Sequence, residues 1–125
     1  MAGTLTISTL SDGTNSTSST NCIQGSAKAW VNFNASSGTA VINTSYNVSS
    51  ITTVTTGSFT VNFTNALTDA NYVVVGSSGT GASDYRQLVP NFNLAPTASA
   101  CRVQTASVGT NTANNDLYNS VAFLR

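Results

Sequence analysis

Side chains that could perform acid–base or nucleophilic chemistry are few in this chain of 125 residues. It has no histidine and no glutamate, and its acids are four isolated aspartates, Asp12, Asp69, Asp84 and Asp116. Without an imidazole there is no Ser–His–Asp or Cys–His arrangement and no histidine general base. Each aspartate has a small or polar neighbour of the kind found in turns. We therefore predict that the protein is not an enzyme and has no catalytic residues.

The same short inventory argues against a metal or cofactor. Zinc would have only Cys22 and Cys101, which are far apart in the chain and not spaced as a ligand pair. Calcium would find two oxygen-bearing side chains at residues 12–15 or 69–71, a weak signal beside turn formation. No metal and no cofactor are expected. Because the N-terminus does not look like a secretory signal, we expect free thiols; a disulfide joining the N-terminal residues to the rest is the alternative.

Charge is unusually scarce, and this excludes several classes of partner. Charged residues make up 6% of the chain, the net charge is zero, and Ser, Thr and Asn together account for 53 of the 125 residues. Four scattered cations cannot neutralise a phosphate backbone, so no nucleic acid is expected. No apolar run reaches the roughly 18–20 residues of a membrane span. With 40% hydrophobic residues, the composition is that of a folded domain and not of a disordered chain.

Any functional site is expected to be positioned by short β-strands, as the composition shows. Thr, Val, Ile, Phe and Tyr are abundant, and they alternate with polar residues between clusters of Gly, Asn, Asp and Ser. The apolar run at 72–75 predicts burial on both faces, and Pro90 predicts an edge strand. About eight strands at this spacing are typical of an antiparallel β-sandwich or jelly-roll-like domain, here residues 27–125. The predicted strands are 4–10, 27–34, 39–48, 58–64, 72–76, 85–92, 101–105 and 117–124.

Residues 1–26 differ from the rest of the chain. An alternating stretch at 4–10 is followed by residues 11–21, which hold no apolar side chain and cannot bury enough surface to become ordered by themselves. We predict an extended N-terminal docking arm that contacts its partner through Leu5, Ile7 and Leu10. A mobile tail is the alternative.

Two Gly- and Asn-rich loops, residues 76–83 and 109–115, are the candidate ligand-contact regions, because the end loops of a sandwich often carry binding residues. An exposed aromatic ring could stack on a sugar. For Trp30 we expect core packing in preference to sugar binding, and for Tyr85 the two alternatives are balanced. The candidate contact residues are Gly79, Gly81, Asp84, Tyr85, Asn111 and Asn114.

Five sequence blocks resemble a module of tailed-bacteriophage virion proteins that are described as structural or tail-fibre-like. They are residues 4–13 (TLTISTLSDG), 25–34 (GSAKAWVNFN), 45–51 (SYNVSSI), 57–64 (GSFTVNFT) and 66–72 (ALTDANY). The resemblance covers residues 1–76 and carries no catalytic residue with it.

The resemblance implies a virion structural protein on the surface of the particle, assembled as a homotrimer. Its partners would be further copies of itself and phage capsid or tail proteins. The short chain leaves little room for a fibre shaft, which favours a capsid decoration (cement) protein that stabilises the shell. The alternative is a tail-fibre or receptor-binding module that contacts host surface glycans.

Overall fold

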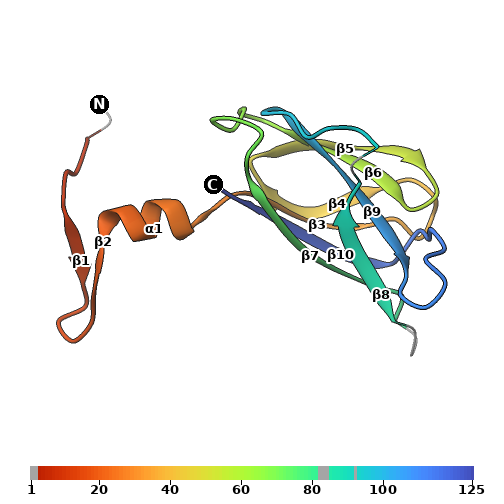
Figure 1. Ribbon diagram of the computed structural model, residues 1–125, viewed down its shortest axis with the longest axis horizontal. Coiled ribbons are helices and arrows are strands. Elements are labelled where there is room, and N and C mark those ends of the chain that lie inside the picture. The colour runs from red at the N-terminus through yellow and green to blue at the C-terminus, as the bar shows by residue number, and fades with distance from the viewer. Residues whose placement is uncertain (1–2, 82–84, 92) are drawn as a thin grey trace.

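The computed structural model describes residues 3–81, 85–91 and 93–125. Two four-stranded antiparallel sheets pack face to face, which confirms the predicted β-sandwich (Figure 1). The first sheet has the order β4-β3-β10-β7, formed by β3 (Ala27–Asn34), β4 (Val41–Tyr46), β7 (Val73–Gly79) and β10 (Tyr118–Leu124). The second sheet has the order β5-β6-β9-β8, formed by β5 (Val48–Thr55), β6 (Ser58–Phe63), β8 (Arg86–Pro90) and β9 (Ala100–Ser107).

The core lies between the sheets and is built from alternate residues of the strands. Successive side chains of a strand point to opposite faces, so only every second residue reaches the core. Phe63 meets Phe123 edge-on with ring centroids 4.9 Å apart, and Phe33 meets Phe59 at 5.3 Å. The alternation read from the sequence thus located these strands correctly. Other buried core residues are Ala29, Val31, Val61, Cys101, Val103 and Val121.

The strand predicted at 39–48 covers β4 and the first residue of β5, which belongs to the other sheet; residues 49–55 of β5 lay outside every predicted strand. Asn47 has a left-handed backbone (φ 55°), which ends β4 at Tyr46 and turns the chain into β5. Its amide nitrogen donates to the carbonyls of Lys28 (3.0 Å) and Asn65 (3.1 Å), and its amide oxygen accepts from the backbone N–H of Asn65 (2.8 Å). Asn47 therefore ties together three segments at the corner between the sheets.

Burial on both faces was the wrong prediction for residues 72–75. Val74 packs against the core, but Val73 and Val75 point outward and are 62% and 50% exposed. A continuous apolar run does not reveal which of its faces is covered, and here one is not. The prediction for Pro90 is confirmed, because β8 is an edge strand of the second sheet.

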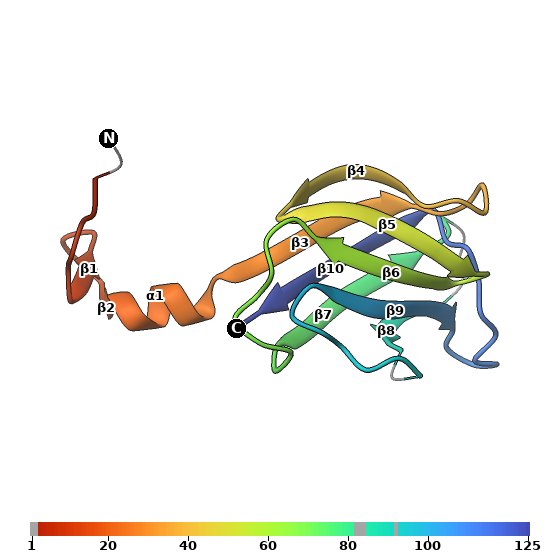
Figure 2. The same cartoon turned by 90° about the horizontal axis from the view of Figure 1, so that it is seen from above.

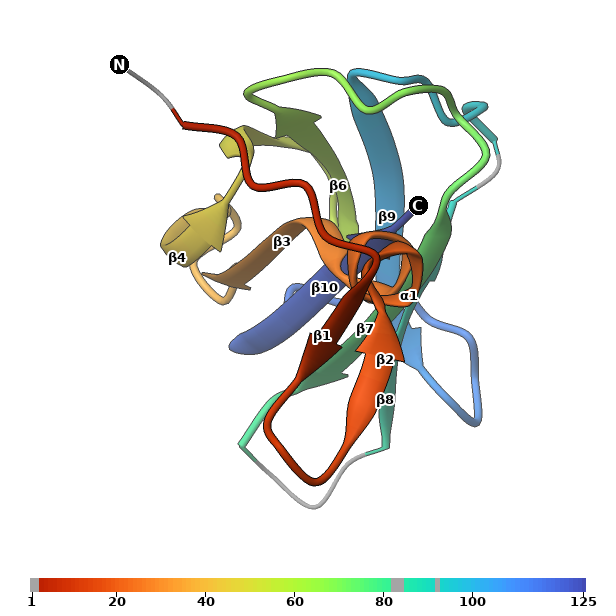
Figure 3. The same ribbon diagram turned by 90° about the vertical axis from the view of Figure 1, so that its left-hand side faces the viewer.

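The N-terminal segment, residues 3–26, projects from the sandwich (Figures 1 and 2). It forms a hairpin of β1 (Thr9–Ser11) and β2 (Ser16–Ser18), followed by the seven-residue helix α1 (Ser19–Gly25). The strand predicted from residue 4 begins only at Thr9. Residues 11–21, predicted to lack order of their own, are organised by local hydrogen bonds: Asp12 Oδ1 accepts from the backbone N–H groups of Thr14 (2.9 Å) and Asn15 (2.7 Å). Figure 3 views the molecule from this segment, with the hairpin in front of the sandwich.

Candidate functional site

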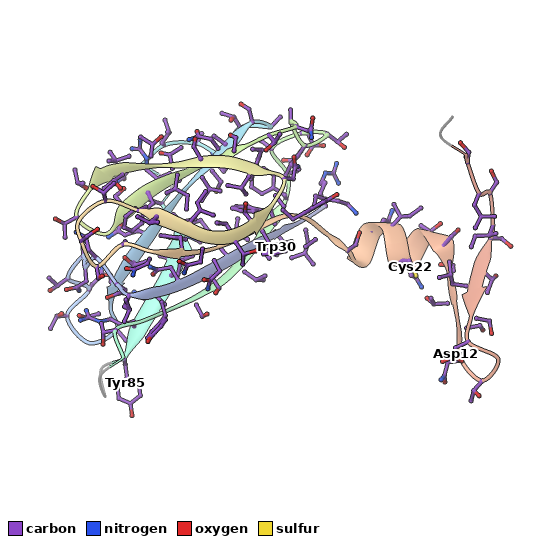
Figure 4. All side chains as sticks on the ribbon, turned by 180° about the vertical axis from the view of Figure 1, so that it is seen from behind. Asp12, Cys22, Trp30 and Tyr85 are labelled. Atoms are coloured by element: carbon purple, nitrogen blue, oxygen red, sulfur yellow. The ribbon has the colours of Figure 1, made fainter. Side chains whose placement is uncertain are left out.

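Of the predicted ligand-contact loop 76–83, residues 76–79 belong to β7, and residues 82 and 83 lie outside the described residues. The end of β7 and the second predicted loop, residues 109–115, lie at the end of the sandwich opposite α1 (Figure 2). The carbonyl of Tyr85, before β8, accepts a hydrogen bond from the backbone N–H of Val108 (3.0 Å). Gln87 Nε2 donates to Asn111 Oδ1 (3.4 Å). The side chain of Tyr85 is 83% exposed at the tip of this end (Figure 4). The structure thus brings Tyr85 and Asn111 to one surface.

The other candidate loop residues have different surroundings. Gly79 ends β7, and Gly81 has a left-handed backbone (φ 81°) close to the ring of Tyr118. Asn114 donates from its side chain to Ser107 Oγ (3.1 Å), so it holds its own loop against β9. Asp84 lies outside the described residues.

A cluster of buried polar side chains lies inside the sandwich next to these loops. Ser78 Oγ lies 2.5 Å from Asp116 Oδ2 and 2.8 Å from Asn119 Oδ1, and Arg86 Nε lies 3.4 Å from Asp116 Oδ1. Asp116 and Asn119 are fully buried. Asp116 was predicted to be an ordinary turn residue; the cluster was missed because its members are distant in sequence and meet only when the strands pair. Since it faces the interior, we assign the cluster a structural role.

Among the other ionisable groups that the structure describes, Asp69 forms an ion pair and Cys101 is enclosed, whereas Cys22 is exposed. Asp69 receives a two-pronged hydrogen bond from Arg125, with Nε to Oδ1 at 2.9 Å. This contact, with the backbone N–H of Asn71, lowers the pKa of Asp69. The two cysteines are unpaired: Cys22 is exposed on α1, whereas Cys101 is in the core, where burial raises the pKa of its thiol.

Among the described residues, no three His, Cys, Asp or Glu side chains come together as metal ligands. The helix found in the described part of the chain is too short to cross a bilayer.

The predicted docking residues are exposed on the N-terminal segment. Leu5, Ile7 and Leu10 are 81%, 37% and 47% exposed, and together with Cys22 and Ile23 they line an open apolar hollow of about 370 Å³. Their role in docking stays a prediction.

The junction between α1 and β3 is held by a side chain that the sequence reasoning did not single out. Lys28 Nζ donates to the carbonyl of Ile23 and to Ser26 Oγ (2.8 Å). The lysine thereby links the C-terminal end of the helix to the first residues of β3.

One apolar surface was not predicted. On the outer face of the first sheet, Trp30 pairs with Tyr46 on one side and Ala122 on the other, and Ala122 pairs with Val75. Trp30 was expected in the core; it is 37% exposed on the sandwich near the linker to α1 (Figure 4). The prediction was wrong because Ala29 and Val31 occupy the inward phase of β3, which leaves Trp30 in the outward phase.

No protein-family model, curated protein or solved structure matches this chain. Its function is therefore argued from its own residues and from the resemblance described above.

Proposed function

We propose that this protein is a non-enzymatic structural protein that attaches to a larger assembly through its N-terminal segment. The supporting observation is that Leu5, Ile7 and Leu10 are exposed on a segment that projects from a sandwich with a core of its own. Apolar side chains gathered outside a core mark interaction sites. The assembly is the surface of a bacteriophage particle, and the protein is a capsid decoration protein that stabilises the shell; this placement derives from the sequence resemblance.

The hairpin offers a physical route to attachment. A two-stranded hairpin by itself is marginally stable in water, and it gains stability when a neighbouring chain adds a strand to its edge. Strand addition uses backbone N–H and C=O groups and apolar side chains, and these are what the N-terminal segment presents. Such a contact needs no charged partner, in keeping with a chain of zero net charge.

The test compares two triple variants for binding to particles that lack the protein. Leu5→Ser/Ile7→Ser/Leu10→Ser alters the N-terminal segment, and Val41→Ser/Val54→Ser/Val108→Ser is the matched control at exposed valines of the sandwich. We expect that the first variant does not cosediment with particles. We also expect that it does not raise the melting temperature of the shell. The control should bind like the wild type. Equal binding of both variants would refute attachment through the N-terminal segment.

A second candidate function is supported by the loop end of the sandwich. Tyr85 is 83% exposed, and Gln87, two residues further along, contacts Asn111. An exposed ring with amides at the same end of the sandwich suits stacking on a sugar. As a receptor-binding module, the protein would bind glycans on an array of host surface saccharides, and Tyr85→Ala would abolish that binding. A decoration protein would bind none of them.

A further inference from the structure

The N-terminal segment and the sandwich are joined by a short junction, residues 25–28. In Figure 2, α1 lies beyond the N-terminal end of β3 and away from both sheets. None of the residues of α1 is buried, so packing against the sandwich does not hold the helix in place. The direction in which the segment projects is therefore set by bonds at the junction itself.

Lys28 makes hydrogen bonds on both sides of this junction. Its backbone carbonyl accepts from Asn47 Nδ2 (3.0 Å), which anchors Lys28 to the corner between the two sheets. Its side chain reaches back to α1, where Nζ donates to the carbonyl of Ile23 and to Ser26 Oγ (2.8 Å). The last carbonyls of a helix have no partner within the helix, and the helix dipole favours a cation at this end. A single residue thus connects the corner of the sandwich to the end of the helix.

The backbone between Lys28 and the helix is free of other contacts that would fix it. Gly25 is the last residue of α1, and a Cβ at this position would have no atom from another part of the chain within 4 Å. Ser26 is extended (φ −81°, ψ 143°), and its hydroxyl donates to the carbonyl of Ile23 (3.1 Å). The bonds among Ile23, Ser26 and Lys28 can therefore open without any change in the core.

We propose that Lys28 is the latch of a hinge at Gly25 and Ser26. While its side chain is bonded to the end of α1, the N-terminal segment is held in one direction relative to the sandwich; when these bonds open, the segment swings. Within the described part of the chain, Lys28 forms no ion pair, and its Nζ bonds go to neutral oxygens. Such bonds are individually weak in net terms, which suits a contact that opens and closes.

The inference rests on the proposed function for the role of this latch. The predicted docking residues Leu5, Ile7 and Leu10 lie on the N-terminal segment, so the angle at the hinge determines how the sandwich is oriented on the particle. A segment that is already held in one direction loses less conformational freedom on binding than one that swings, and this favours affinity. The latch itself is a property of the free protein and is measured without particles.

The angle at the hinge is measurable by double electron–electron resonance between two nitroxide labels on the full-length protein. Cys22 is exposed on α1 and takes one label, whereas Cys101 is buried. Val73→Cys takes the other, at an exposed position on the end of the first sheet nearest α1. With Lys28 in place we expect a narrow distribution of distances between the labels. Lys28→Met should give a broad distribution and an unchanged circular dichroism spectrum.

Arg125→Met is the matched control. Arg125 lines the same hollow of about 230 Å³ as Lys28, but its guanidinium bonds to Asp69 and not to the N-terminal segment, so this variant should keep the narrow distribution. Lys28→Arg retains a cation with donors for the Ile23 carbonyl and should also keep it. In cosedimentation with particles that lack the protein, we expect Lys28→Met to bind about three- to ten-fold more weakly than the wild type.

A broad distribution with Lys28 in place, or a narrow one for Lys28→Met, would overturn the inference. Equal broadening by Arg125→Met would also overturn it, because the effect would not be specific to Lys28. A broadened distribution with unchanged particle affinity would refute the role of the latch in attachment. If Lys28→Met broadens the distribution and neither it nor the wild type binds particles, the proposed function fails and the latch stands.

Discussion

Asp116 and Arg86 form an ion pair inside a protein with very little charge. The side chain of Asp116 is completely buried and that of Arg86 nearly so. Removing one partner of a buried pair leaves the other charge poorly compensated. We expect Asp116→Ala to lower the free energy of unfolding by about 3–5 kcal/mol, measured by urea denaturation. Asp69→Ala, which breaks the exposed pair with Arg125, should have a far smaller effect; similar effects of the two changes would contradict this role.

Tyr72 makes stability sensitive to alkaline pH. Burial raises the pKa of Tyr72 above its ordinary value of 10.0, and its hydroxyl donates to the carbonyls of Thr97 and Ala100 (both 3.1 Å). When the pH exceeds this ordinary pKa, the phenol of Tyr72 loses its proton in the unfolded state but keeps it in the folded state. The folded state then binds more protons, so the free energy of unfolding falls as pH rises beyond about 10.

Tyr72→Phe tests this dependence in urea denaturation at a series of pH values. At neutral pH the variant should be less stable by about 1 kcal/mol, because a hydrogen bond is lost. Its stability should then fall less steeply than that of the wild type above about pH 10. Tyr118→Phe, at an exposed tyrosine, is the control and should keep the wild-type slope. If the free energies of unfolding of Tyr72→Phe and the wild type fall in parallel above about pH 10, Tyr72 is not the cause of the pH dependence.

At the level of elements, the corner between β4 and β5 depends on the backbone and the side chain of Asn47. Asn47→Gly keeps the left-handed backbone but loses the side-chain hydrogen bonds to Lys28 and Asn65, and should cost about 1–3 kcal/mol. Asn47→Ala loses the same bonds and must also adopt a conformation unfavourable for a residue with a Cβ, at about 1 kcal/mol more. Urea denaturation of both variants separates the two contributions. Equal free energies of unfolding for Asn47→Gly and Asn47→Ala would mean that the left-handed backbone costs nothing for a residue with a Cβ.

Alternation predicted most of the strands in which one face is buried and the other is not, but it missed residues 49–55 of β5. Residues 27–34 and 58–64 show this pattern, and their inward residues form the core. Alternation failed at residue 47, because the pattern of polar and apolar residues does not change where the chain passes from one sheet to the other. It failed again at 72–75, because an apolar run is compatible with a covered or an uncovered outer face. The N-terminal hairpin was missed because its order comes from local hydrogen bonds of Asp12 and not from burial.

At the scale of the whole molecule, the site was only partly predictable. Loop composition pointed to two candidate ligand-contact regions, and the structure places their described residues at one end of the sandwich because β7, β8, β9 and β10 all begin or end there. The apolar surface around Trp30 was beyond sequence reasoning, since it depends on the register that aligns Trp30 with Tyr46 and Ala122. Residues on four strands become neighbours only after the sheet has formed.

Assembly of this protein should be nearly independent of salt. The predicted docking residues Leu5, Ile7 and Leu10 carry no charge, so screening has little to act on. We expect the dissociation constant for particle binding to change by no more than about two-fold between roughly 0.05 and 0.5 M NaCl. Particle cosedimentation measures this constant. A loss of binding at the higher salt would show that charge drives assembly.

The pairing of β3 with β10 determines how the domain bears force. Ala27, where β3 begins, lies opposite Leu124, where β10 ends, at the same end of the first sheet. Tension between these two points would peel the strands apart one hydrogen bond at a time. Tension between α1 and the loops at the far end would instead load many of the bonds of β3 at once, because they lie perpendicular to the strand. A domain tethered by its N-terminal segment and pulled at its far end is thus strained in its mechanically stronger direction.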